Sequence, residues 1–154
     1  MKEDIKKLNN IARSLKRMSM KVKLIKLISR AKQEYDSYDY KNAQKSLEEA
    51  NKIDSKNPTV LRGLGCLKQF EQNYEEALGY FKKALKYSKN KELEYTLIGT
   101  VYFLQDNLEE ALNYYNLAID ANESYEKAYE GRNQAMLENH VKLLDLQDAL
   151  KKYF

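Results

Sequence analysis

Residues 39–50 read DYKNAQKSLEEA, residues 73–84 read NYEEALGYFKKA, and residues 107–118 read NLEEALNYYNLA. The three segments begin 34 residues apart, and each has alanine at its fifth and twelfth positions. A fixed period of this length is typical of repeat proteins, in which each unit buries its apolar face against its neighbours. The period therefore predicts the fold, and it favours binding over catalysis.

The composition indicates a chain made of helices. Its 154 residues suit one domain, and they include one proline and five glycines. Few segments alternate between apolar and polar residues as strands do. The single cysteine excludes an internal disulfide and favours a reducing compartment, so a cytoplasmic location is expected. No apolar stretch is long enough to span a membrane, and no secretory signal is expected.

Helical periodicity around the alanines predicts pairs of helices. In the second unit, Asn57 is a candidate cap, Pro58 suits a first helical turn, and the first helix is expected to end near Gln72. A turn at Asn73 then leads into a second helix. The third unit repeats this arrangement with a turn at residues 106–107. The first unit is degenerate, with its turn near residues 37–39.

These patterns resemble the tetratricopeptide repeat over about residues 24–139. That family places Leu-Gly on its first helix and an Ala-aromatic-Ala series on its second, as in Ala77, Phe81 and Ala84. The proline that often ends each repeat is replaced by Ser55, Lys89 and Glu123. The residues expected to define the packing are Ala43, Ala50, Gly65, Ala77, Phe81, Ala84, Gly99, Ala111, Tyr115 and Ala118.

The resemblance implies an all-α, right-handed α-solenoid of three helix-turn-helix repeats. The expected divisions are a basic amphipathic N-terminal helix (1–22), a degenerate first repeat (24–57), a second (58–91), a third (92–124) and C-terminal capping helix or helices (125–154). Whether the last segment forms one helix or turns at residues 139–140 is open at this point. A capping helix would shield the last repeat from water.

Stacked repeats present their first helices on a concave face, which is where a partner is expected. An apolar patch there would mark a binding site. The alternatives are that these side chains pack against the terminal helices, or that the assigned face is wrong by one residue. The candidate groove residues are Ile28, Lys32, Tyr35, Arg62, Cys66, Gln69, Phe70, Leu93, Leu97, Thr100, Phe103, Leu104 and Gln134.

The family resemblance also suggests two kinds of client. Some tetratricopeptide repeat proteins bind C-terminal carboxylates of heat-shock chaperones through a basic clamp. The matching places here hold Ile28, Lys32, Gly63, Leu93 and Leu97, so only one is charged and this client is not expected. The three-repeat architecture also resembles small type III secretion chaperones, which hold apolar segments of translocator proteins.

The first 32 residues carry eleven Lys/Arg against two acids, whereas the rest of the chain carries 16 basic and 21 acidic residues. Within this basic segment, apolar residues recur at spacings of 3-4-3-4-3, the pattern of a helix that packs on another helix. They are Leu8, Ile11, Leu15, Met18, Val22 and Ile25. Packing on the body or in a homodimer, contact with an anionic membrane, and contact with nucleic acid are the three interpretations. The absence of Trp and Phe weakens the second, and the absence of a nucleic-acid module weakens the third.

The sequence gives no indication of an enzyme. It has one histidine and one cysteine, and it lacks a Gly-rich phosphate loop and any metal-ligand motif, so no cofactor or metal is expected. The leading hypothesis is a non-catalytic protein–protein interaction module or scaffold that binds an apolar peptide segment in its concave groove. The alternatives are a homo-oligomerising unit that uses the N-terminal seam, and a small secretion-type chaperone for a translocator-like client.

Overall fold

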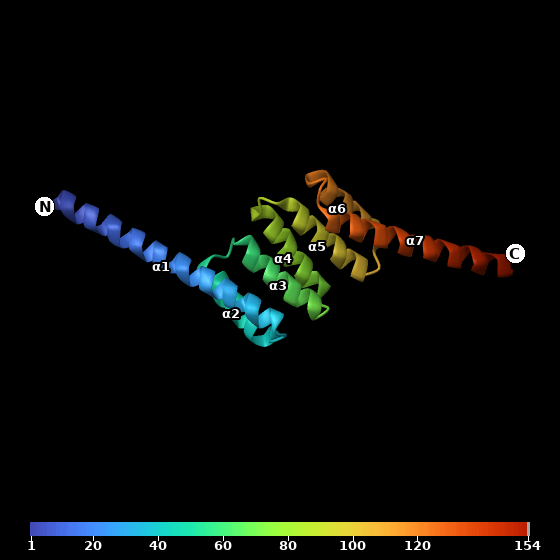
Figure 1. Cartoon of the computed structure of the whole chain (residues 1–154), viewed down its shortest axis with the longest axis horizontal. Helices are drawn as coiled ribbons and strands as arrows, with labels where there is room; N and C mark the ends of the chain where they lie inside the picture. Colours follow the sequence, from blue (N-terminus) through green and yellow to red (C-terminus); the bar gives the residue numbers. More distant parts are fainter. Residues whose placement is uncertain (154) are drawn as a thin grey trace.

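The computed structural model describes residues 1–153, and within them it contains seven helices and no strand (Figure 1). The all-α solenoid that the 34-residue period predicts is confirmed. The helices are α1 (Lys2–Asp36), α2 (Tyr40–Ile53), α3 (Pro58–Phe70), α4 (Tyr74–Tyr87), α5 (Lys91–Leu104), α6 (Leu108–Ala121) and α7 (Glu126–Tyr153).

The helices pack as successive hairpins: α1 with α2, α3 with α4, and α5 with α6, while α7 lies against α5 and α6. Contacts between hairpins run from α2 to α3 and from α4 to α5. Each hairpin therefore touches mainly its neighbours in the chain, which is the arrangement of a repeat array.

The turns inside the hairpins repeat as regularly as the helices. Tyr38, Gln72 and Asp106 lie 34 residues apart, and each has a positive φ of 60–63°. The residue after each of them caps the next helix; Asn73, for example, accepts a hydrogen bond from the backbone N–H of Glu76. The cap side chain satisfies a backbone donor that has no partner within the helix. The same three-residue turn thus starts α2, α4 and α6.

All ten residues assigned to repeat packing are buried. The glycines among them allow the aromatic rings to approach the backbone. A Cβ on Gly65 would lie 2.5 Å from the ring of Phe81, and a Cβ on Gly99 would lie 3.0 Å from the ring of Tyr115. Gly131 of α7 contacts Tyr115 still more closely, because a Cβ there would lie 2.4 Å away. The ring of Tyr115 therefore joins α6 to both α5 and α7.

The two terminal helices are longer than the repeats require. The basic segment and the first helix of the first repeat form one uninterrupted helix, α1, and the C-terminal segment is likewise a single helix, α7. Both extend well beyond the central hairpins (Figure 1). Only the first half of α7 covers the last repeat, through the buried Ala128 and Ala135. We call residues 2–22 of α1 the N-terminal arm.

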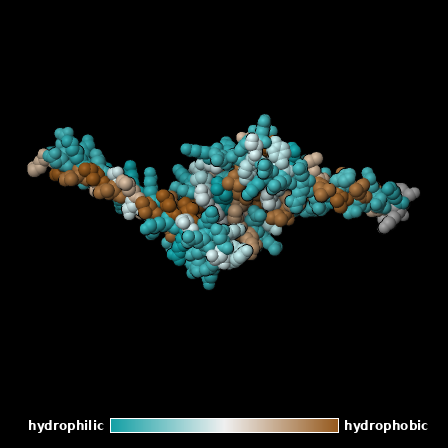
Figure 2. Space-filling model, viewed as in Figure 1, coloured by the Kyte–Doolittle hydropathy of each residue, from teal (hydrophilic) through white to brown (hydrophobic). Residues whose placement is uncertain are grey.

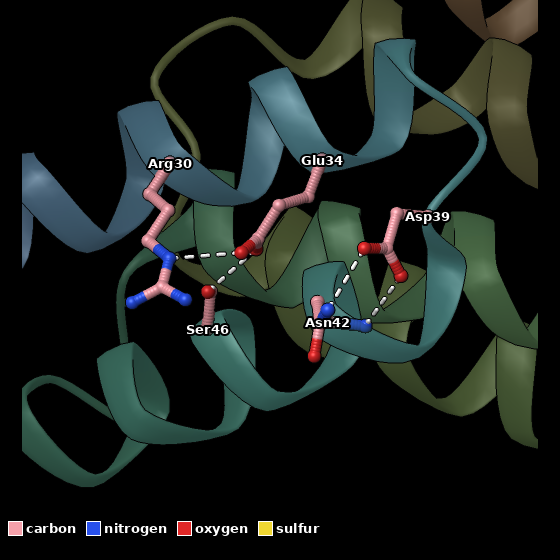
Figure 3. Close-up of polar contacts among 5 residues, drawn as sticks. All are labelled: Arg30, Glu34, Asp39, Asn42 and Ser46. Atoms are coloured by element: carbon pink, nitrogen blue, oxygen red, sulfur yellow. Dashed lines mark hydrogen bonds and ion pairs between the residues drawn. The ribbon is translucent and has the colours of Figure 1, made fainter.

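A small polar network fixes α1 on α2 (Figure 3). Arg30 donates from Nε to Oε1 of Glu34 at 2.8 Å, and the buried hydroxyl of Ser46 donates to Oε2 of the same carboxylate at 2.6 Å. At the turn, the Asn42 side chain and backbone both donate to the capping carboxylate of Asp39. Of these contacts, the Ser46–Glu34 hydrogen bond joins α2 to α1.

Candidate functional site

The first two hairpins enclose a hollow of about 260 Å³ that opens to solvent. Helices α1, α2 and α3 contribute its walls, and its lining combines apolar, aromatic and basic side chains. The lining residues are Ile28, Ala31, Lys32, Tyr35, Leu47, Thr59, Arg62, Gly63 and Cys66. Five of the thirteen groove residues expected from the sequence therefore meet in one place. Leu47, from the second helix of the first repeat, was not among them.

An aromatic cluster adjoins the hollow. The ring of Tyr40 lies 5.2 Å from that of Tyr35 and 4.2 Å from that of Phe70, measured between centroids. The Phe70 side chain nevertheless stays 58% exposed. We call Tyr35, Tyr40 and Phe70 the aromatic shelf. It offers flat apolar surface beside the hollow, which is the kind of surface that anchors partners in protein interfaces.

Burial favours the neutral forms of two lining groups, Cys66 and Tyr35. Burial raises the pKa of the Cys66 thiol, against a smaller opposing effect of the Arg62 charge. Burial also raises the pKa of Tyr35, and the nearby Cys66 and Tyr40 add to this rise. Desolvation favours the uncharged form of an acid. Cys66 is therefore a protonated lining group at neutral pH rather than a nucleophile.

Arg62 forms the one long-range ion pair of the site. Its guanidinium lies 2.7 Å from Oε1 of Glu94 in α5, and the Glu94 side chain is fully buried. Oε2 of Glu94 and Nε of Arg62 have no hydrogen-bond partner in the protein. Sequence analysis did not identify this glutamate. The available signal was the repeat itself, because Glu94 lies 34 residues after Val60, which is also fully buried.

The remaining predicted residues lie outside the hollow. Leu97 packs against the core cluster around Phe81, and Phe103 packs against the cluster around Tyr115, so both belong partly to the core. Thr100 accepts a hydrogen bond from the Tyr115 hydroxyl at 3.3 Å. Leu104 is 46% exposed. Gln69 and Leu93 are half-buried and Gln134 is exposed.

Among residues 1–153, no group of three or more His, Cys, Asp or Glu side chains is arranged to hold a metal ion. Over the same range, no helix combines the length and apolar character needed to cross a bilayer.

A model of the tetratricopeptide repeat family matches residues 63–91 and 95–125. These ranges cover most of the second and third repeats expected from the sequence. No curated protein is similar enough in sequence to count as a relative.

Solved structures share the fold at low sequence identity. A Thermobaculum terrenum O-GlcNAc transferase mutant matches 76% of this chain with a TM-score of 0.71 and 20% identity, but this covers only 22% of that chain. The first tetratricopeptide repeat domain of Spaghetti (RPAP3), bound to an HSP90 peptide, matches 77% of this chain and 94% of that chain. Its TM-score is 0.69 and its identity 15%.

The Yersinia enterocolitica type III secretion chaperone SycD, in complex with a peptide of the translocator YopD, matches 75% of this chain and 94% of that chain. Its TM-score is 0.67 and its identity 18%. The repeat family model and these structures agree with the 34-residue period and with the burial of the small residues. The second and third repeats therefore match the tetratricopeptide repeat family in sequence, and the chain shares the fold of the tetratricopeptide repeat structures.

Proposed function

We propose that this protein is a non-catalytic interaction module whose hollow and aromatic shelf bind an apolar peptide segment. The observation that carries the proposal is the hollow itself, whose walls are mainly aliphatic and aromatic. At about 260 Å³ it is smaller than the sites that enclose drug-sized ligands, and it suits one large apolar side chain. Phe70 at the end of α3 and Leu104 at the end of α5 are exposed, and they provide further contact points on the first helices of the second and third repeats.

The charges at the hollow favour an uncharged client segment. Glu94 pairs with Arg62, so Lys32 is the one unpaired cation in the lining. A single exposed lysine does not build the multi-point clamp that a terminal carboxylate needs. The RPAP3 domain shares the fold, but the clamp positions here are mostly apolar, and we do not expect an HSP90-type tail to bind. The finer version of our proposal is an apolar segment of a translocator-like protein; SycD, which shares the fold, binds a peptide of the translocator YopD.

The test compares two leucines of similar exposure on different faces. Leu104 ends a first helix and is 46% exposed, whereas Leu117 lies on the second helix of the same hairpin and is 43% exposed. Peptides of about twelve residues are selected from a displayed random library on the full chain, and the best binder is labelled for fluorescence anisotropy.

We expect Leu104→Ala and Tyr35→Ala each to weaken binding at least about tenfold, and Leu117→Ala to leave it unchanged. Equal effects of Leu104→Ala and Leu117→Ala would contradict the assignment of the groove. Because Phe103 contributes to the core, Phe103→Ala is expected to lower stability as well as binding, and it is not a useful probe.

A second candidate function is self-assembly, and a specific observation favours it. The six apolar residues spaced 3-4-3-4-3, five on the N-terminal arm and Ile25 just after it, are all more than half exposed, and no other part of the described residues covers them. We call these six residues the seam. An exposed apolar row of this length is typical of helices that pair with another helix.

A further inference from the structure

The seam faces away from the body. Consecutive residues of an α-helix are rotated by about 100°, which places Val22 and Ile25 on the side of α1 opposite Leu24 and Leu27. The exposures agree, because Leu24 and Leu27 are buried against the first repeat while Val22 is 52% and Ile25 is 66% exposed. Figure 2 shows the apolar side chains as a stripe along the arm. The seam is thus a surface separate from the repeat core.

The spacing of the seam is symmetric about a point between residues 16 and 17. If a second copy of α1 runs antiparallel to the first, Leu8 faces Ile25 of that copy, Ile11 faces Val22, and Leu15 faces Met18. Each apolar residue then meets another apolar residue. The three pairings each occur twice, once on either side of the two-fold axis. Such a contact is related by a two-fold axis and closes on itself, so it produces a dimer and not a filament.

The charges favour the antiparallel direction over the parallel one. In a parallel pair, Asp4 would meet Asp4 of the second copy on the seam line, and Lys21 would lie beside Lys26. In the antiparallel pair, Asp4 lies opposite Ser29 of the second copy, with Lys26 and Lys32 of that copy about one turn to either side. The acidic first turn of α1 then meets a basic stretch.

The positions beside the seam also suit a protein helix better than a lipid surface. In mid-arm they are Ala12, Ser14 and Ser19, which are small and uncharged and allow a second helix to approach closely. Arg13, Lys16 and Arg17 face the other way, where they line a hollow against Ile53 and Asp54 at the end of α2. Towards the two ends of the seam the flanking positions hold Lys7, Lys21 and Lys26, so contact with an anionic membrane is one outcome of the test below.

We infer that the N-terminal arm is a dimerisation device that pairs antiparallel with the arm of a second copy, in the register Leu8–Ile25, Ile11–Val22 and Leu15–Met18. The inference rests on the second candidate function, self-assembly, and it adds the occupant, the direction and the register. The two repeat bodies lie at opposite ends of the paired arms.

The first experiment measures mass by multi-angle light scattering from about 5 to about 200 µM full chain. We expect a mass twice the 18.1 kDa of one copy. Leu15→Lys places a charge in the central layer and should give monomers. Asn10→Lys adds the same charge outside the seam and should leave the dimer intact. A monomeric wild-type chain at all concentrations would overturn both self-assembly and the inference. A dimer that Leu15→Lys does not disturb would overturn the inference and leave self-assembly standing.

The second experiment tests the direction by cross-linking, with Cys66→Ala as the background. Leu15→Cys and Met18→Cys are prepared separately and oxidised alone and as a mixture. The antiparallel register predicts disulfide-linked dimers mainly in the mixture, because residue 15 faces residue 18. Dimers formed by each variant alone would overturn the antiparallel arrangement and leave self-assembly standing. Binding of a monomeric chain to phosphatidylserine vesicles, abolished by Leu15→Lys, would assign the seam to a membrane instead.

Discussion

Replacement of Arg62 by alanine is expected to destabilise the fold through Glu94. The Glu94 carboxylate is fully buried, its Oε2 already lacks a partner, and Arg62 provides the hydrogen bond to Oε1. Removing one partner of a buried ion pair costs about 3–5 kcal/mol, because the other charge stays buried without compensation. The Arg62 side chain is 25% exposed, so water screens part of the pair. We therefore expect a loss at the lower end, about 3 kcal/mol.

The companion variant removes both charges. Val60 occupies the place in the second repeat that Glu94 occupies in the third, so Glu94→Val has a precedent within the chain. Combined with Arg62→Met, it replaces the ion pair by apolar side chains. We expect the double variant to lie within about 1 kcal/mol of the wild type or to be more stable. The single variants Arg62→Met and Glu94→Val complete a double-mutant cycle with the wild type and the double variant.

The assay is urea unfolding followed by far-UV circular dichroism. The slope m is compared among the wild type, Arg62→Ala and the variants of the cycle. An unchanged m shows that a shift in midpoint reports stability. The reasoning is refuted if Arg62→Ala loses less than about 1 kcal/mol. It is also refuted if the double variant is no more stable than Arg62→Ala, because the cost would then not come from the unpaired carboxylate.

Three further predictions concern stability. Gly65→Ala should cost about 1–3 kcal/mol, because its Cβ would lie 2.5 Å from the Phe81 ring, whereas Gly79→Ala, with open space around the new Cβ, should gain about 0.5–1 kcal/mol in urea unfolding. Gln72→Gly should raise the thermal midpoint, because glycine adopts a positive φ without the steric strain that a Cβ causes, for a net gain of about 0.5–1 kcal/mol; a lower midpoint would contradict this. Stability should fall above about pH 8.5, because the unfolded thiol ionises there while burial keeps folded Cys66 protonated; Cys66→Ala should flatten this part of the pH profile.

The repeat architecture could be predicted because its signal is both local and periodic. The alanines at 43, 77 and 111 mark close helix crossings, and residues such as Asn73 mark the turns, so these features identify the hairpins. The expected first helix of the second repeat ends at Phe70, two residues before the predicted Gln72. Gln72 instead takes the left-handed turn conformation. The sequence does not show whether the helix ends at Phe70 or at Gln72, because neither residue has a strong preference at a helix end.

The site was predictable only in part, because it depends on contacts between repeats. Helical spacing placed Ile28, Lys32 and Tyr35 on one face, and the structure gathers them with Arg62 and Cys66. Spacing alone could not show that Phe103 turns into the core around Tyr115, because that depends on how α7 packs. The pairing of Arg62 with a residue 32 positions later also has no local signal. Long-range partners follow from the stacking of repeats, which a single helical wheel does not describe.

The continuity of α1 has a mechanical consequence. This helix runs from the arm to the wall that holds Ile28 and Tyr35, and over its 35 residues it has neither proline nor glycine, the usual sites of kinks. The arm therefore acts as a lever about 33 Å long, fixed at the first hairpin. A tilt of about 5° at the point where the arm leaves the first hairpin moves the far end by roughly 3 Å, which is enough to change how two helices pack. A client that shifts this wall would thereby change how strongly the arm binds a second molecule. By reciprocity, binding at the arm would change the affinity of the hollow for the client.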